Sequence, residues 1–109
     1  MKHYLKISTD FSQTPGARYY EDGDFSGQEF YDKKLRFAFE KALHENAILR
    51  IDLDGTEGYA TSFLDEAFLR LAQEFGKTKA WNNIEIISKE EPDWIDEVKS
   101  YIFDAPDAS

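Results

Sequence analysis

The stretch Ile48-Leu-Arg-Ile-Asp-Leu-Asp-Gly-Thr-Glu-Gly-Tyr-Ala-Thr-Ser-Phe-Leu-Asp-Glu-Ala-Phe68 decides the fold, because an apolar segment runs through a glycine-containing loop directly into a helix. Within residues 48–53, Leu49, Ile51 and Leu53 fall on one face of a strand. We expect this segment to be the central strand of a sheet. The loop that follows it then lies at the carboxyl end of that strand, where α/β proteins usually carry their functional groups.

A helix is predicted from about Ser62 to Phe75, followed by a glycine at the position that commonly ends helices. Its apolar residues recur at helical spacing, at Leu64, Phe68, Leu71 and Phe75. Thr61 and Ser62 therefore lie where this helix begins.

The remaining segments complete an α/β pattern. A capping box, Ser26-Gly-Gln-Glu29, predicts the start of an earlier amphipathic helix. Strands are predicted at residues 3–8, 18–21 and 83–88, and a last helix is predicted with Pro92 in its first turn. The order β-β-α-β-α-β-α predicts a mixed sheet of about four strands covered by about three helices. We expect one domain over residues 1–103 and a frayed tail over residues 104–109.

Composition narrows the function. The 109 residues are 41% hydrophobic and 16% aromatic, which is typical of a folded domain. There is no Cys, and the net charge of −9 arises after residue 50, where 14 acidic residues face 5 basic ones. This balance argues against nucleic acid as a partner. Without a signal sequence or a membrane-spanning apolar run, we expect a cytoplasmic protein with no membrane contact. No cofactor is expected.

Two segments together resemble a known family. The first segment is Pro15-Gly-Ala-Arg-Tyr, continued by Asp22-Gly-Asp-Phe-Ser-Gly-Gln-Glu-Phe30, and the second is the stretch from Ile51 to Phe68. They are similar to the bacterial STAS-like family of unknown function. The resemblance covers most of residues 10–75 and implies a fold similar to that of anti-sigma factor antagonists. Those proteins are non-enzymatic switches that bind a kinase-like partner.

The resemblance also implies a control mechanism. In anti-sigma factor antagonists one hydroxyl at the start of the helix after the central strand is phosphorylated. Thr61 matches that acceptor position and Ser62 the next one, whereas Ala60 replaces an acidic residue. An ATP-binding protein of the histidine-kinase type is the partner class that this similarity implies.

Phosphorylation at this place is physically reasonable. A phosphate at a helix N-terminus meets unpaired amides and the positive end of the helix dipole. With Glu57, Asp65 and Glu66 nearby, its charge would deepen an acidic patch and repel a partner that fits the unmodified form. Alternatively, Thr61 or Ser62 simply caps the helix, and both roles can coexist. The docking loop is expected to comprise Gly55, Glu57, Gly58, Tyr59, Asp65 and Glu66.

An enzymatic alternative comes from Asp52-Leu-Asp54-Gly-Thr, which resembles the first motif of haloacid-dehalogenase-type phosphatases. In that family the first Asp attacks phosphorus and the second acts as acid and base beside Mg²⁺, so these two carboxylates are the alternative metal ligands. Only 53 residues follow Thr56, which leaves little room for the rest of such an enzyme. We therefore expect a non-enzymatic protein in which Asp54 bonds local amides.

Two further features are secondary candidates. Arg18 either holds an anion together with the Gly23 loop, or forms a salt bridge to Asp22 or Asp24. Phe37 lies opposite the apolar stripe of the first helix, where an exposed ring could anchor a partner.

Overall fold

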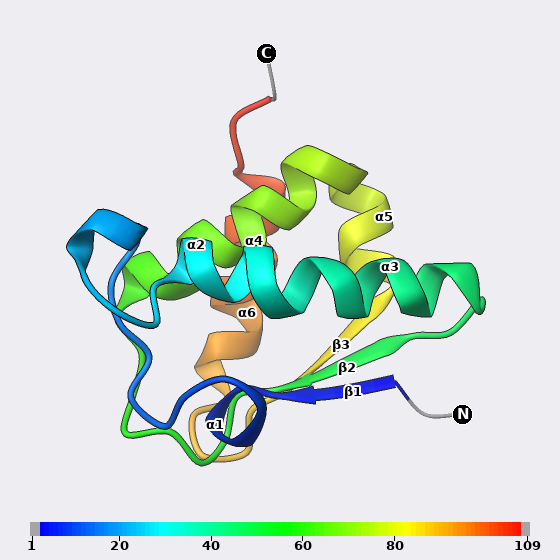
Figure 1. Ribbon diagram of the computed structural model, residues 1–109. Helices are drawn as coiled ribbons and strands as arrows, with labels where there is room; N and C mark the ends of the chain where they lie inside the picture. Colours follow the sequence, from blue (N-terminus) through cyan, green and yellow to red (C-terminus); the bar gives the residue numbers. More distant parts are fainter. Residues whose placement is uncertain (1–2, 108–109) are drawn as a thin grey trace.

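A three-stranded parallel sheet forms the centre of the computed structural model, which describes residues 3–107 (Figure 1). The strands are β1 (His3–Lys6), β2 (Leu49–Asp52) and β3 (Ile84–Ile87), in the order β1-β2-β3. Leu5, Ile51 and Ile86 are aligned across the sheet and all three are buried. The prediction of 48–53 as the central strand is confirmed.

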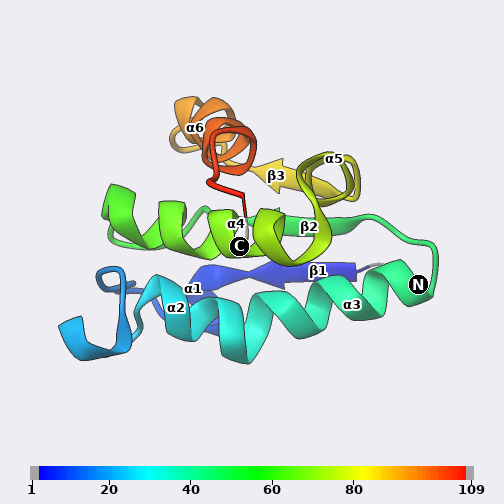
Figure 2. The same ribbon diagram turned by 90° about the horizontal axis from the view of Figure 1, so that it is seen from above.

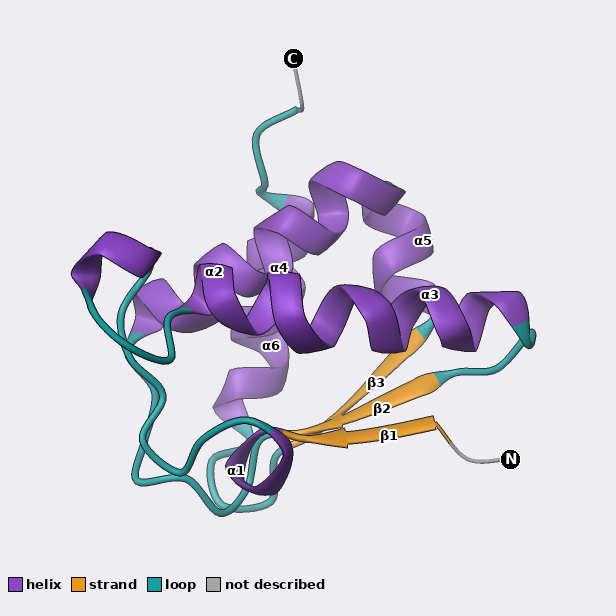
Figure 3. Cartoon of the chain, viewed as in Figure 1, coloured by secondary structure: helices purple, strands orange, loops and turns teal. Residues whose placement is uncertain are grey.

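Helices cover this sheet on one side (Figures 1 and 2). They are α2 (Gly27–Phe30), α3 (Arg36–His44), α4 (Thr61–Phe75), α5 (Lys77–Asn82) and α6 (Asp93–Phe103). A π-helical turn over Tyr31–Leu35 joins α2 to α3, so residues 27–44 form one continuous helical segment (Figure 3). The opposite sheet face is open, because Tyr4, Arg50 and Glu85 point away from the helices and are exposed.

The core lies between the sheet and the helices. Its largest fully buried side chains are Phe30, Phe39, Phe63, Phe68, Ile7, Leu35, Leu49, Ile51, Leu53, Leu64, Leu71 and Ile102. Half of them come from the predicted apolar stripe of α4 (Leu64, Phe68 and Leu71) and from the predicted inner face of the central strand (Leu49, Ile51 and Leu53). Burying such apolar faces is the main source of stability for a domain of this size. None of the helices described between residues 3 and 107 is long and apolar enough to cross a membrane.

The predicted second strand at residues 18–21 is wrong. The chain instead forms a 3₁₀ turn over Tyr20–Asp22. The amide of Tyr19 donates to the Asp22 carboxylate at 3.0 Å, and the amide of Tyr20 donates to the Gln28 side chain at 3.1 Å. Because these local acceptors satisfy the backbone, the segment does not need a strand partner. The sheet consequently has three strands, all parallel, rather than a mixed set of four.

Two helices were not predicted. The chain turns from β1 straight into α1 (Ile7–Asp10), where the Asp10 carboxylate accepts the Lys6 amide at 2.8 Å, so the expected strand over 3–8 ends early. Helix α5 begins immediately after Gly76, whose positive φ of 94° ends α4 and redirects the chain. In the expected tail, Ala105 is buried and Pro106 accepts a hydrogen bond from Gln73; residues 108–109 lie outside the described range.

Candidate functional site

Thr61 and Ser62 are the first two residues of α4, as predicted. Thr61 is exposed and Ser62 is half-buried. The N-cap position is occupied by Ala60, which offers no side-chain acceptor, and neither hydroxyl forms a hydrogen bond within residues 3–107. The expectation that one of them caps the helix is therefore wrong. Both hydroxyls remain available for other chemistry at the amide end of a 15-residue helix.

An aromatic cluster anchors the start of α4. Phe63 is fully buried, and its ring lies 5.6 Å from that of Phe30, 5.7 Å from that of Tyr59 and 6.1 Å from that of Phe11. Such contacts between rings add to the hydrophobic stabilisation. The first turn of α4 is thus held in a fixed position, while Thr61 beside it is exposed.

The loop before α4 is ordered by its own contacts. The Tyr59 hydroxyl donates to the Leu53 carbonyl at 2.8 Å, and burial raises the pKa of that phenol. The Glu57 amide donates to the Gln13 carbonyl at 2.8 Å. Gly55 and Gly58 have φ values of 94° and 136°, which favour glycine. Gly55, Glu57 and Gly58 are exposed, so much of the expected docking loop is reachable.

Arg18 does not pair with Asp22 or Asp24, so that prediction is wrong. Its guanidinium donates to the carboxylates of Asp65 at 2.9 Å and Glu66 at 3.1 Å, both on α4. Burial of Arg18 opposes its charge, but these two hydrogen bonds prevail and raise its pKa. The guanidinium is thereby occupied by carboxylates of the chain itself. This arrangement removes the basis for an anion site at Arg18.

A compact ion cluster results on the first turns of α4. The Glu66 side chain is only 5% exposed and also accepts a hydrogen bond from Arg70, one helical turn further along. Of the three carboxylates expected to form an acidic patch, two are therefore neutralised, and Glu57 alone is not in an ion pair within the described range. The i,i+4 spacing of Glu66 and Arg70 could have revealed that pair from sequence. Nothing local indicates the contact with Arg18.

Asp52 and Asp54 lie at the carboxyl end of β2, and their side chains bond neighbouring groups. Asp52 accepts the Tyr4 hydroxyl and, at 2.9 Å, the Asp54 amide. Asp54 accepts the amides of Lys89 and Glu90 at 3.0 Å and 2.9 Å, as expected for a carboxylate that fixes a loop. Through this contact the loops after β2 and β3 are tied together.

Both carboxylates also line a hollow of about 530 Å³ on the open face of the sheet. The other residues that line it are Tyr4, Lys6, Arg50, Glu85, Ile87 and Lys89. Within residues 3–107 no group of three or more His, Asp or Glu side chains is placed to hold a metal ion. Two carboxylates thus lie beside lysines, as the phosphatase alternative requires. Each carboxylate, however, already accepts hydrogen bonds from neighbouring groups of the chain.

The other secondary candidates are separated from this site. Gly23 has a φ of 127°, and the nearby Asp22 carboxylate bonds its own turn through the Tyr19 amide. Phe37 is 59% exposed on α3, as predicted, with the Arg36 guanidinium 5.9 Å from its ring centre. Neither residue contacts the start of α4 through any hydrogen bond or ion pair in the described part of the chain.

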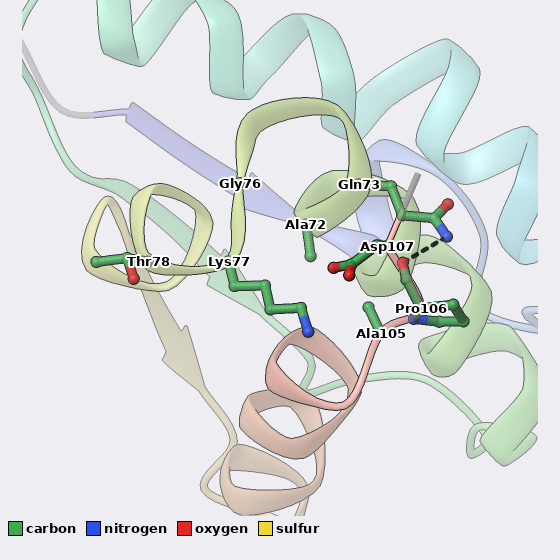
Figure 4. Close-up of a pocket in the computed structure, with 8 residues that line it drawn as sticks. All are labelled: Ala72, Gln73, Gly76, Lys77, Thr78, Ala105, Pro106 and Asp107. Carbon is green, nitrogen blue, oxygen red and sulfur yellow. Dashed lines mark hydrogen bonds between the residues drawn. The ribbon is translucent and has the colours of Figure 1, made fainter. Parts of the chain in front are cut away.

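A further hollow lies between the end of α4, the start of α5 and residues 105–107 (Figure 4). Its volume is about 450 Å³. The side chains of Lys77 and Asp107 extend toward it, and Gln73 donates to the Pro106 carbonyl at 3.1 Å beside it. It lies at the opposite end of α4 from Thr61.

These features define a small α/β domain with a parallel sheet covered on one side. An exposed threonine begins the helix that follows the central strand, and a half-buried serine comes next. Comparison with known families matches residues 26–94 to the STAS-like domain of unknown function (DUF4325). The chain belongs to this family. No curated protein and no solved structure gives a significant match to the chain.

Proposed function

We propose that this protein is a non-enzymatic regulatory domain that acts by protein–protein contact, in the manner of anti-sigma factor antagonists. Its docking surface is the loop from Gly55 to Ala60 and the first turn of α4. The observation that carries this proposal is the exposed Thr61 hydroxyl, which begins α4 and is not used as a cap. Chemical control at this point requires no unfolding of the domain.

Phosphorylation of Thr61 or Ser62 is the proposed switch. A phosphate on either residue adds about −1.5 to −2 charges and would lie at the N-terminal end of α4, where the helix dipole favours negative charge. Thr61 is the preferred acceptor because its side chain is exposed, whereas that of Ser62 is half-buried. The partner class is an ATP-binding protein of the histidine-kinase type, and the cytoplasm is the proposed site of action.

Ser62 would produce a second effect if it were modified. Asp65 and Glu66 lie three and four residues after it, on the same side of α4. A phosphate there would repel both carboxylates and attract the Arg18 guanidinium that now binds them. The segment that carries Arg18 would then shift relative to α4. The switch therefore has a means of changing the surface beyond the added charge.

The test is a binding measurement with an ATP-binding protein of this type from the same cells. We compare wild type with Thr61→Glu, which carries a negative charge, and with Thr61→Gln, a neutral control of the same size. Glu is expected to weaken binding by about tenfold relative to Gln, which corresponds to about 1.4 kcal/mol. Equal binding by the two variants would contradict control by charge at this position.

A second candidate function is phosphate-ester hydrolysis by Asp52 and Asp54, favoured by the hollow that both carboxylates line beside Lys6 and Lys89. An assay with an aryl phosphate and Mg²⁺ separates the two proposals. Turnover that is lost in Asp52→Asn, in a variant whose unfolding temperature is unchanged, would favour the enzyme. Turnover that is absent or equal in both proteins would favour the regulatory function.

A further inference from the structure

Residues 18–25, here named the aromatic loop, expose three large side chains. Tyr19 is 39% exposed, Tyr20 is 44% exposed and Phe25 is 39% exposed. Single exposed aromatics are common on protein surfaces, but here Tyr19 and Tyr20 border the same hollow, and Phe25 ends the same loop. Aromatic residues gathered in this way are typical of surfaces that bind other proteins.

Backbone contacts hold the aromatic loop in one conformation. The Gly16 amide donates to the Phe25 carbonyl at 2.8 Å, and the Gln28 amide donates to the Arg18 carbonyl at 3.0 Å. Phe25 has a φ of 60°, and its amide donates to the Glu29 carboxylate at 3.1 Å. A loop fixed before binding loses little conformational entropy when a partner arrives. The exposed rings are therefore prepared for contact.

The two tyrosines border a hollow of about 410 Å³, which Glu21, Gln28 and Arg70 complete. The Tyr20 hydroxyl donates to the Asp32 carboxylate at 3.2 Å, which fixes the ring at the rim. Burial of Tyr20, followed by the nearby Asp32 charge, raises the pKa of this phenol. The hollow can receive one extended side chain of a partner.

The carboxylates around this hollow favour a positively charged side chain of the partner. Glu21, Asp22, Asp24 and Asp32 are exposed, and none of them forms an ion pair within residues 3–107. The guanidinium groups of Arg18 and Arg70 bind Asp65 and Glu66 of α4. The positive charge of Arg70 still reaches Tyr20, but the four exposed carboxylates outnumber it. Tyrosine faces attract cations, and the Arg18 guanidinium already lies 6.0 Å from the ring centre of Tyr19.

We propose that the aromatic loop is a docking surface for a Lys- or Arg-rich segment of a protein partner, with its cationic side chains over Tyr19 and Tyr20 and between the surrounding carboxylates. This inference deepens the proposed function. It rests on one part of that function, namely that the domain acts by contact with another protein. The aromatic loop and the start of α4 lie at the same end of the molecule (Figures 1 and 2). Arg18 connects them through Asp65.

The test is a nuclear magnetic resonance titration of the full chain. The probe is a short synthetic peptide of repeating Gly-Arg-Leu units, and the matched control is a peptide of repeating Gly-Glu-Leu units. The basic peptide is expected to shift the amide signals of residues 19–25 and 28, and the acidic peptide is expected to shift none. Shifts spread evenly over all acidic segments, including residues 90–97, would overturn the proposal.

Variants locate the contact. The double variant Tyr19→Ala with Tyr20→Ala is expected to bind the basic peptide about tenfold more weakly. Phe103→Ala, which removes a ring of equal exposure on α6, is expected to bind it like wild type. Should the double variant lose its fold, Glu21→Gln with Asp24→Asn replaces it, since neither side chain makes a hydrogen bond within the described residues. Undiminished binding by the folded variant would overturn the proposal.

A last variant separates this inference from the phosphorylation switch. Thr61→Ala with Ser62→Ala removes both hydroxyls and leaves the aromatic loop unchanged. It is expected to bind the basic peptide like wild type. Failure of the peptide to bind would reject the docking surface alone, whereas failure of the Thr61→Glu comparison would reject the switch alone.

Discussion

The close approach of α2 to the start of α4 depends on Gly27, and replacing this residue by Ala gives a decisive test of that packing. A Cβ atom at this position would lie 2.4 Å from the Phe63 carbonyl oxygen and 3.2 Å from the Glu66 Cβ. An ordinary contact begins at 3.4 Å, so the two helices would have to separate by about 1 Å. The obstacle is backbone, which cannot turn aside as a side chain can.

The magnitude follows from two opposing effects. Overpacking of a close contact costs about 1 to 3 kcal/mol. Replacing Gly by Ala in a helix ordinarily gains about 0.5 to 1 kcal/mol, because the unfolded chain loses freedom. The two ranges give a net loss of about 0 to 2.5 kcal/mol. Because the clash is with backbone, we expect Gly27→Ala to lower the free energy of unfolding by about 1 to 2 kcal/mol. For a domain of this length this corresponds to about 4 °C in Tm for each kcal/mol.

Thermal unfolding followed by circular dichroism, together with urea unfolding, measures the effect. Lys34→Ala is the control, since it changes an exposed residue of the same helical segment and is expected to alter stability by less than about 0.5 kcal/mol. The sign of the result is decisive. An unchanged or higher Tm for Gly27→Ala would refute the close approach of α2 to α4.

Three other predictions concern the side-chain contacts. Tyr4→Phe tests the hydrogen bond to Asp52, which, together with burial, raises the pKa of Tyr4 to about 12. Between the ordinary pKa and the raised one, the folded state binds one proton more than the unfolded state, so the stability of wild type should fall as the pH rises. Urea unfolding should show a less steep fall in the variant. Glu66→Ala should cost about 1 to 3 kcal/mol, because it leaves Arg18 and Arg70 without their shared carboxylate, and Lys33→Ala on an exposed ion pair should cost far less. Asp54→Ala should cost about 1 to 3 kcal/mol and speed hydrogen exchange of the Lys89 and Glu90 amides, whereas unchanged exchange would contradict its role in joining the two loops.

The sequence predicted the elements whose signals are local and long. Ser26 caps the helix as predicted, with the Glu29 amide donating to the Ser26 hydroxyl at 3.0 Å. The reciprocal half of the predicted capping box does not form, because the Glu29 carboxylate accepts the Phe25 amide instead of the Ser26 amide. The continuous apolar stripe of α4 and the alternating residues of β2 also appear where predicted. In these segments propensity, periodicity and burial favour the same structure, so little competes with it.

Other parts of the fold could not be predicted because their structure depends on contacts distant in sequence. The aromatic residues at 18–21 have strand propensity, yet the acceptors on Asp22 and Gln28 hold a turn there. The short helix α5 follows a glycine that ordinarily marks the end of helical structure. Each case shows hydrogen bonds or packing overriding local preference.

In the candidate site, too, the features with local sequence signals were predicted and those that depend on distant contacts were not. The placement of Thr61 and Ser62 at a helix start followed from the strand, loop and stripe around them. Their freedom from capping did not, because it depends on Ala60 occupying the N-cap position. Arg18 was predicted to hold an anion or to pair with Asp22 or Asp24, but its carboxylate partners on α4 emerge only when the chain is folded. Long-range ion pairs leave no periodic signal in a single sequence.

Phosphate mapping on the protein isolated from its own cells tests the central claim most directly. Mass spectrometry of the intact chain and of its fragments would be compared for wild type, Thr61→Val and Ser62→Ala. The account predicts a single phosphate within residues 61–62, carried by Thr61 in wild type. In Thr61→Val the phosphate should be lost, or should move to Ser62 if that hydroxyl replaces Thr61 as the acceptor. A phosphate elsewhere in the chain, or none under any growth condition, would contradict the account.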